Sequence, residues 1–388
     1  MTRQGTAMKA QWPLGAPGGL GHGRRCAPMG LAEQLRRGNA TGVCEEKWRC
    51  RKFIVLHEHM SHATSKPGLL DGLMDALVVP GYSRIGYALR SHGWKPSLST
   101  PLEGRRVVVT GHTSGIGFAA GQQLRALGAD LVLVGRDSQR VAEAAERIRT
   151  VKGPGSIEHL VADMGEPSQV RALANVLIAD GCRIDVVVHN AGALLKTRSR
   201  NSLGVDTTIA VHVYGPHLLT NLLLPRLKES NGRVITVSSG GMYAVALPDC
   251  ARNGALEMSD ESYDGTKQYA IAKRAQVTLN EMWSERPDTD GVSFHAMHPG
   301  WVDTPGVATS IPLFRTLTRP ILRSASQGAD TIAWLASAEP QVVGTGGFWC
   351  DRVRRPVHRL TVTRRSDTSA ARAALWTHVE SAALGSTS

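Results

Sequence analysis

The chain has 388 residues, of which 42% are hydrophobic, and it carries a formal net charge of +12 at pH 7. That charge lies at the two ends. Residues 1–65 hold ten Lys and Arg against four Asp and Glu, residues 352–388 hold seven against two, and the remainder is almost neutral. The neutral centre argues against nucleic acid as a partner. The lack of a run of roughly 18 apolar residues argues against a membrane-spanning helix.

Residues 1–65 are rich in Gly, Pro and Arg and show no sustained hydrophobic period. This composition predicts a disordered, basic N-terminal extension. A transit peptide and a translation start placed too far upstream both stay open as its origin.

A helical lead-in is predicted for residues 66–103. Apolar residues share one face of its first helix, at Leu69, Leu70, Leu73, Leu77 and Val78. Pro80 ends this helix, and a second short amphipathic piece follows. We expect the lead-in to pack on the next domain. A membrane-interfacial or dimer helix stays open, because basic residues flank the apolar face.

From residue 104 onward, short apolar runs alternate with amphipathic segments. Strands are predicted at 105–110, 130–135, 158–162, 184–189, 233–238, 292–297 and 346–350. Helices are predicted at about 115–127, 138–150, 167–179, 203–228, 267–285 and 326–337. These repeated units indicate an α/β fold over residues 104–351, with one Rossmann-type, doubly wound parallel sheet of about seven strands and helices on both faces. Residues 352–388 are predicted as a basic C-terminal tail with one amphipathic helix near 370–383.

The segment RRVVVTGHTSGIG, residues 105–117, carries the most specific motif. A buried strand leads into a turn with Gly111, Gly115 and Gly117, and a helix follows. Glycines let the backbone turn tightly and approach a dinucleotide, whose pyrophosphate would lie at the positive end of the helix. A simple tight turn is the alternative. TGHTSGIG resembles the TGxxxGxG motif of the short-chain dehydrogenase/reductase superfamily, and FHAMHPGWVDTPGV resembles its retinol-dehydrogenase-like branch.

The resemblance implies a series of contacts with a nicotinamide dinucleotide. Around the pyrophosphate it implies Gly111, Thr113, Ser114, Gly115, Ile116 and Gly117. At the adenine edge it implies Asp163 and Met164. On the nicotinamide side it implies Asn190, Ala191, Gly192, Pro299, Gly300, Trp301 and Thr304, together with the catalytic Tyr269 and Lys273. An Asp after a strand is also a common helix cap, and Pro-Gly is a common turn, so these assignments depend on the order of the motifs.

Arg136 bears on the choice of cofactor. It follows the second predicted strand and lies 19 residues after Gly117, where the adenosine ribose is expected. A guanidinium there can pair bidentately with a 2′-phosphate, so we predict NADP(H) rather than NAD(H). Asp137, one residue later, keeps NAD(H) open because a carboxylate can bond the 2′-hydroxyl.

The same resemblance assigns catalysis to Ser239, Tyr269 and Lys273. Ser239 would hydrogen-bond the substrate carbonyl and polarise it. Tyr269 and Lys273 stand at i and i+4 of a predicted helix, so an ammonium would lie near the phenol. We expect this ammonium to lower the pKa of Tyr269 and let it exchange a proton near neutral pH. The family's lysine also bonds the nicotinamide ribose.

Two features of the catalytic region leave alternatives open. His212 occupies the place of the family's catalytic Asn, where it could support a water beside the lysine, could titrate, or could have no chemical role. A second Tyr-x-x-x-Lys pair is formed by Tyr263 and Lys267. We favour Tyr269 because it lies 30 residues before Pro299, about the separation found in the superfamily, and because Asp264 and Gly265 indicate a helix start after Tyr263.

We therefore predict an oxidoreductase that interconverts an alcohol and a lipophilic or small carbonyl compound by hydride transfer. The alternatives are a cofactor-binding sensor or scaffold of the same fold without activity, and a nucleic-acid or membrane tether acting through the basic ends. A small-molecule substrate is the expected partner, and a homo-oligomer stays open.

Cysteine usage bears on location and metal binding. The six cysteines show no Cys-x-x-Cys pair and no spacing typical of disulfides. We expect reduced thiols and a cytoplasmic location, with weak association with a membrane periphery left open. The Cys and His residues between Cys44 and His62 fit no common zinc-ligand spacing, so we predict no metal site.

Removal of the residues that precede Ser65 should leave turnover and melting temperature unchanged. The segment offers too little periodic apolar surface to offset the entropy of ordering it. A chain that begins at Ser65 can be compared with the full chain by activity and thermal unfolding. Failure of the shorter chain to fold would show instead that the extension packs on the domain.

Overall fold

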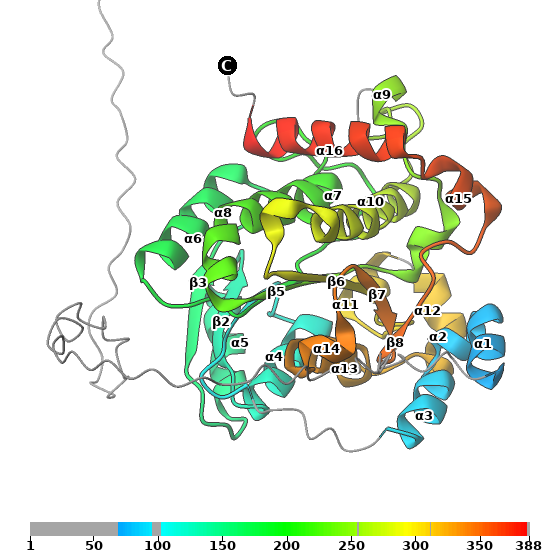
Figure 1. Ribbon diagram of the computed structural model, residues 1–388. Coiled ribbons are helices and arrows are strands. Elements are labelled where there is room, and N and C mark those ends of the chain that lie inside the picture. Colours follow the sequence, from blue (N-terminus) through cyan, green and yellow to red (C-terminus); the bar gives the residue numbers. More distant parts are fainter. Residues whose placement is uncertain (1–68, 95–101, 254–255, 311, 386–388) are drawn as a thin grey trace, which may run out of the picture. The chain divides into compact units, whose positions relative to one another are not determined.

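The computed structural model describes residues 69–94, 102–253, 256–310 and 312–385 (Figure 1). An eight-stranded sheet lies at its centre, with the order β3-β2-β1-β4-β5-β6-β7-β8. Neighbouring strands are parallel, except that β8 runs antiparallel to β7. The predicted fold class is confirmed. The predicted disorder of residues 1–65 falls outside the described residues.

All seven predicted strands are present within two residues of their expected ends. They are β1 (Arg106–Thr110), β2 (Asp130–Gly135), β3 (Ile157–Val161), β4 (Val186–His189), β5 (Arg233–Val237), β6 (Ser293–Met297) and β7 (Gly347–Cys350). The residues of β1, β4, β5 and β7 are buried throughout, as expected of strands covered on both faces. The eighth strand, β8 (Val353–Arg354), has two residues, too few for a periodic signal.

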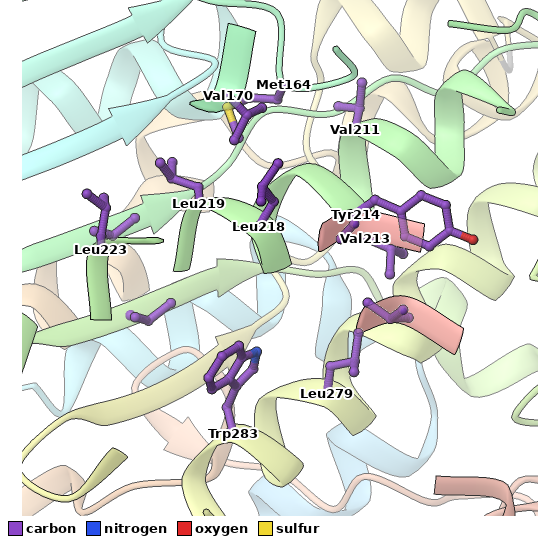
Figure 2. Close-up of a cluster of buried hydrophobic side chains, with 14 of the residues drawn as sticks. Met164, Val170, Val211, Val213, Tyr214, Leu218, Leu219, Leu223, Leu279 and Trp283 are labelled. Carbon is purple, nitrogen blue, oxygen red and sulfur yellow. The ribbon is translucent and has the colours of Figure 1, made fainter. Parts of the chain in front are cut away.

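Helices cover both faces of the sheet and build two core clusters (Figure 1). One face carries α4 (Gly115–Ala126), α5 (Ser138–Arg149) and α13 (Ala325–Ser337). The other carries α6 (Pro167–Ala179), α8 (Gly215–Ser230) and α10 (Gly265–Glu285). Figure 2 shows part of this second core, where Leu218, Leu219 and Leu223 of α8 gather near Trp283 of α10.

Several short elements were not predicted, because each is too short to show a period. They are α9 (Cys250–Asn253), α11 (Pro305–Ser310), α12 (Pro312–Thr318), α14 (Pro340–Val343) and the 3₁₀ turns Gly240–Ala244, Pro287–Thr289 and Arg319–Ile321. Among the described helices, none combines the length and the apolar character needed to cross a bilayer.

The long helix predicted at 203–228 is divided. Asp206 caps the short α7 (Thr207–Ile209), a π-helical turn follows at Ala210–Tyr214, and α8 then continues to Ser230. The hydrophobic period does not distinguish a π turn from an α-helix, so the sequence could not reveal the division. Such turns often occur at functional sites, and this one contains His212.

The lead-in folds as α1 (Leu69–Ala76), α2 (Val79–Tyr82) and α3 (Arg84–His92). Its buried face is not the apolar stripe seen in the sequence, because Leu73 and Leu77 are 57% and 58% exposed. Ion pairs determine the orientation instead: Asp71 accepts hydrogen bonds from Arg355, and Asp75 pairs with Arg359.

The segment after residue 351 is more than the basic tail that we expected from its composition. It contains β8, α15 (Thr361–Ser366) and α16 (Ser369–Leu384), of which α16 is the helix predicted near 370–383. Leu375 and Trp376 of α16 enter the second core cluster, and the ring of Trp376 lies 4.9 Å from that of Trp283. Many of its arginines pair with acidic residues elsewhere in the chain, so local composition could not show that the segment folds onto the domain.

His217→Phe should stabilise the protein more at pH 5 than at pH 7.5. His217 is buried against Trp283 and Trp376, and neither of its ring nitrogens has a hydrogen-bond partner among the described residues. Burial, aided by the charge of Arg286, lowers its pKa to about 3. The folded protein therefore keeps this ring neutral below pH 6.5, where the unfolded chain takes up a proton.

Proton uptake by the unfolded chain lowers the free energy of unfolding of the unaltered protein. This loss is small well above pH 6.5, grows as the pH falls toward 3, and amounts to about 2 kcal/mol at pH 5. Urea unfolding of both proteins at the two pH values measures it. The exposed His92, replaced by Gln, is the control and should leave the pH dependence unchanged. An equal effect of His217→Phe at both pH values would contradict the expectation.

Candidate active site

A cavity of about 580 Å³ opens at the carboxyl ends of the parallel strands. It is lined by the glycine turn after β1, by the residues that follow β2, β3, β4, β5 and β6, and by one face of α10. Every site residue predicted from the sequence borders this cavity. Segments almost 200 residues apart in the chain therefore meet at one place, as expected at the switch point of a doubly wound sheet.

The glycine turn is shaped for close approach to a ligand. Gly111 and Gly115 have φ values of +74° and +56°, which favour glycine. A Cβ on Gly117 would lie 2.2 Å from the carbonyl oxygen of Gly111, so the third glycine lets α4 pack on the turn. Ser114 precedes α4 but its side chain does not cap the helix, which leaves the first backbone N–H groups available to an anion.

Asn190, after β4, braces this turn. Its side-chain nitrogen donates hydrogen bonds to the carbonyl oxygens of Thr110 and Gly111, at 3.0 Å and 2.9 Å. The amide thereby links the end of β4 to the end of β1 and fixes the position of the turn.

Basic side chains mark the end of the cavity beside β2. Arg136 borders the cavity there. Arg140, four residues further along the chain, also borders it and was not predicted from the sequence. Asp137 also borders the cavity, but its carboxylate caps α5 by accepting a hydrogen bond from the backbone of Arg140 at 2.9 Å. Asp163, after β3, accepts a hydrogen bond from the backbone of Gly165 at 2.8 Å and also faces the cavity.

At the opposite end of the cavity, Ser239, Tyr269 and Lys273 lie together. Ser239 lies near enough to Tyr269 to influence its ionisation. The ammonium nitrogen of Lys273 lies 5.3 Å from the centre of the Tyr269 ring and donates a 2.8 Å hydrogen bond to the carbonyl oxygen of Val237. Both side chains come from one face of α10, which starts at Gly265 with Asp264 as its N-cap.

Desolvation dominates the ionisation of this pair. Burial raises the pKa of Tyr269 to about 12, although the neighbouring Ser239 side chain opposes the shift. Burial also lowers the pKa of Lys273 to about 7. We had expected Lys273 to lower the pKa of Tyr269. In the free protein the pKa is raised, because loss of water around the phenol outweighs other influences.

His212 is a neutral, fixed side chain. Its Nε2 lies 3.1 Å from the backbone nitrogen and 3.0 Å from the carbonyl oxygen of Ala193, and its ring stands edge-on to that of Tyr269 at 5.3 Å. Burial and the nearby Lys273 hold the pKa of His212 well below its usual range. Titration of His212 near neutral pH therefore has no support in this geometry.

The second Tyr-x-x-x-Lys pair lies apart from this arrangement. Tyr263 precedes α10, as expected from Asp264 and Gly265, and it does not border the cavity. The guanidinium of Arg198 lies over its ring at 4.7 Å, and Lys267 is exposed.

Comparison with known proteins agrees with this geometry. Residues 105–247 match the family described as short chain dehydrogenase. Dehydrogenase/reductase SDR family member 12 of Bos taurus is 36% identical over 292 residues, which cover 74% of this chain and 90% of that protein. The chain belongs to the short-chain dehydrogenase/reductase family. It is therefore an oxidoreductase by family, and the resemblance seen in the sequence is confirmed.

Two further members of the short-chain dehydrogenase/reductase family illustrate its range. Retinol dehydrogenase 12 of Homo sapiens is 30% identical over 253 residues, which cover 64% of this chain and 78% of that protein. The crystal structure of a short chain dehydrogenase from Burkholderia cenocepacia in complex with NADP superimposes with a TM-score of 0.52 at 23% identity, covering 64% of this chain and 96% of that one. The latter similarity supports the fold alone.

This short-chain dehydrogenase/reductase departs from the family pattern at His189 as well as at His212. The family has the segment Asn-Asn-Ala-Gly after this strand, and His189 stands in place of its first Asn, before Asn190, Ala191 and Gly192. The Nε2 of His189 lies 2.8 Å from the hydroxyl oxygen of Thr220. Burial lowers its pKa to about 4, so it is neutral at physiological pH.

Several residues that line the cavity were not predicted from the sequence. They are small or apolar and carry no motif: Ala193, Leu194, Ala244, Thr266, Val302 and Gly306. Gln276, one turn after Lys273, was also missed. Its amide donates a 2.7 Å hydrogen bond to the carbonyl oxygen of His212 and so ties the π-helical turn to α10.

Proposed function

We propose that the protein interconverts an alcohol and an aldehyde or ketone with NADP(H). One observation carries this proposal: Ser239, Tyr269 and Lys273 converge in the cavity that also contains the glycine turn. A catalytic hydroxyl, a proton donor and a cation thus border the space where a dinucleotide would end.

The residues of the cavity fit a dinucleotide along its length. The uncapped start of α4 would hold the pyrophosphate, and the guanidinium of Arg136 would hold a 2′-phosphate. Asp163 would contact the adenine edge, while Lys273, Pro299 and Thr304 would border the nicotinamide riboside. When bound, the cofactor supplies or accepts the hydride.

The protein's own side chains would donate and accept the proton. In the direction of reduction, the hydroxyls of Ser239 and Tyr269 donate hydrogen bonds to the carbonyl oxygen, and Tyr269 gives its proton to that oxygen. With a pKa of about 12 in the free protein, Tyr269 is a protonated phenol at neutral pH and is ready to donate. The ammonium of Lys273 stabilises the phenolate that remains. In oxidation the proton moves the other way.

The catalytic end of the cavity favours a neutral, apolar substrate. Leu194, Ala244, Trp301 and Val302 border it, and Lys273 is its one cationic side chain among the described lining residues. A lipophilic aldehyde or ketone would therefore bind better than a carboxylate. The name of the relative retinol dehydrogenase 12 is in keeping with such a substrate.

Turnover tests the proposal. NADPH should be oxidised in the presence of lipophilic aldehydes or ketones and not in the presence of a 2-oxo acid. Tyr269→Phe should lower turnover at least about 100-fold, because it removes the proton donor, and should leave NADPH binding nearly intact.

Tyr263→Phe is the matched control and should change turnover little, because Tyr263 lies outside the cavity. If the two variants behave in the opposite way, both assignments on α10 are wrong. NADPH binding without turnover of any carbonyl would favour a sensor or scaffold.

Arg136→Ala should weaken NADPH binding about tenfold or more and leave NADH binding nearly unchanged. The guanidinium would make charge-assisted bonds to the 2′-phosphate, which NADH lacks. Dissociation constants for both cofactors can be measured by fluorescence titration. Lys152→Ala removes an exposed charge outside the cavity and serves as the control. Tighter binding of NADH than NADPH by the unaltered protein would overturn the preference.

A further inference from the structure

The N-terminal helices contact both loops that flank the catalytic end of the cavity. The backbone nitrogen of Trp301 donates a 2.8 Å hydrogen bond to the carbonyl oxygen of Tyr82, the last residue of α2. The ring of Tyr82 reaches the other loop, since a Cβ placed on Gly240 would lie 2.5 Å from it. Gly240 follows Ser239, and Trp301 follows Pro299 and Gly300. Tyr82 therefore touches the neighbours of the proposed catalytic serine and of the proposed nicotinamide segment.

Tyr82 is held rigidly between these loops. It is 4% exposed and belongs to a core cluster with Met242, Tyr243 and Phe348. Its ring lies 4.6 Å from that of His298, at the end of β6, and edge-on to Trp301 at 6.2 Å. The loop after β5 and the loop after β6 thus both contact the ring of Tyr82.

A buried arginine locks the second loop to α2. Arg323 is 1% exposed and donates hydrogen bonds to the carbonyl oxygens of Pro299 at 3.1 Å, Gly81 at 3.0 Å and Ser83 at 3.1 Å. A Cβ on Gly300, where φ is +75°, would lie 2.5 Å from the guanidinium carbon of Arg323. The Pro-Gly segment is therefore pressed against a side chain that is itself bonded to the α2 backbone.

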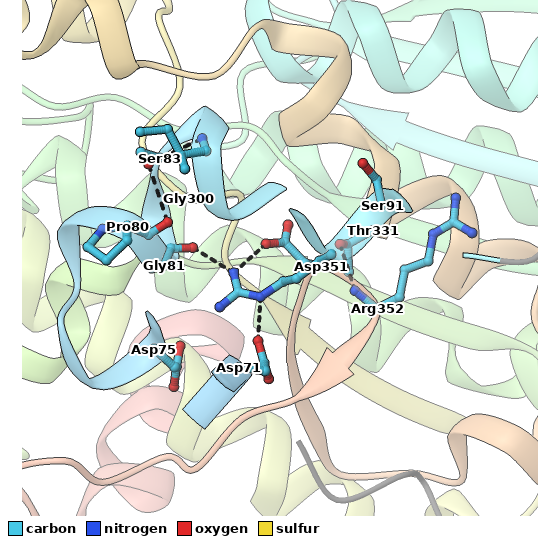
Figure 3. A network of polar contacts seen from close by, with 12 residues as sticks. Asp71, Asp75, Pro80, Gly81, Ser83, Ser91, Gly300, Thr331, Asp351 and Arg352 are labelled. Atoms are coloured by element: carbon cyan, nitrogen blue, oxygen red, sulfur yellow. Dashed lines mark hydrogen bonds and ion pairs between the residues drawn. The ribbon is translucent and has the colours of Figure 1, made fainter. Parts of the chain in front are cut away.

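A second buried arginine, Arg90, links α1 and α3 to α2 and to Asp351. Arg90 of α3 donates hydrogen bonds to Asp71 at 2.5 Å, to the carbonyl oxygen of Gly81 at 2.6 Å and to Asp351 at 2.7 Å (Figure 3). Asp351 also accepts two bonds from Arg323, at 2.6 Å and 2.8 Å. One buried carboxylate thus joins the N-terminal helices to the arginine beneath the Pro-Gly segment. Since buried charges are tolerated only with partners, this arrangement strongly constrains the position of α2.

We infer that Tyr82 is a positioning residue of the active site, which sets the relative position of Ser239 and the Pro299–Gly300 segment. This inference rests on the proposed function. Among the described residues, α1–α3 contact the loops at the catalytic end of the cavity, and no hydrogen bond, ion pair or ring contact joins them to Arg136, Asp163 or the glycine turn. Loss of the Tyr82 ring should therefore disturb the nicotinamide end and spare the adenosine end.

The test compares Tyr82→Ala with Tyr82→Phe. The hydroxyl of Tyr82 has no hydrogen-bond partner among the described residues, so Phe keeps every contact of the ring and should retain kcat. Ala removes the ring and should lower kcat about tenfold or more. It should weaken NADPH binding, yet leave the dissociation constant of adenosine 2′,5′-bisphosphate, which lacks the nicotinamide, unchanged. A merely structural role would weaken both ligands alike or lower only the melting temperature.

A second pair of variants tests the contact with Gly240 itself. Gly240→Ala should lower kcat in the unaltered protein, because the new Cβ collides with the Tyr82 ring. In the Tyr82→Ala background the same change should cost little, because the space is open. If Tyr82→Ala does not fold, Tyr82→Leu, which keeps an apolar side chain but lacks the ring, replaces it in both experiments.

Two outcomes overturn the inference: kcat and NADPH affinity unchanged in the folded Tyr82 variant, or Gly240→Ala and the Tyr82 change acting independently. Both are distinguishable from failure of the proposed function. If the proposed function were wrong, the unaltered protein itself would neither bind NADPH nor turn over a carbonyl.

Discussion

The parallel arrangement of β1 to β7 is the constraint on which the site depends. Parallel strands end at the same edge of the sheet, so each loop after a strand contributes to one place. The hydrogen bonds from Asn190 to Thr110 and Gly111 show how closely these ends are tied. Without the central strands buried on both faces, neither the glycine turn nor the loop that carries Ser239 would have a fixed position.

Removal of water governs the chemistry of the site more than the attraction between charges does. Burial raises the pKa of Tyr269 and lowers those of Lys273 and His212. Each group is therefore driven toward its neutral form in the free protein. Tyr269 is thereby kept as the protonated phenol, and the pKa of Lys273 is brought to about 7.

Ion pairs, several of them buried, hold the segments on either side of the Rossmann domain in place. The lead-in and the C-terminal segment contribute paired charges, and several of these pairs are buried. Arg274 of α10, next to Lys273 in sequence, pairs with Asp367 at 2.7 Å, and both side chains are almost fully buried. Breaking one member of such a pair leaves an uncompensated charge, which costs several kcal/mol. Both segments are thereby part of the same folded domain as the site.

The sequence by itself determined where along the chain the seven main strands lie, because most of them are short apolar runs with a local signal. It also determined many of the residues that border the cavity, since their motifs occur in a fixed order and parallel strand ends must meet. Only the tertiary structure decided which face of α1 is buried, because the partners Arg355 and Arg359 lie almost 300 residues away. The same holds for the ionisation of Tyr269, Lys273 and His212. Burial depends on neighbours from many segments, and no local pattern records them.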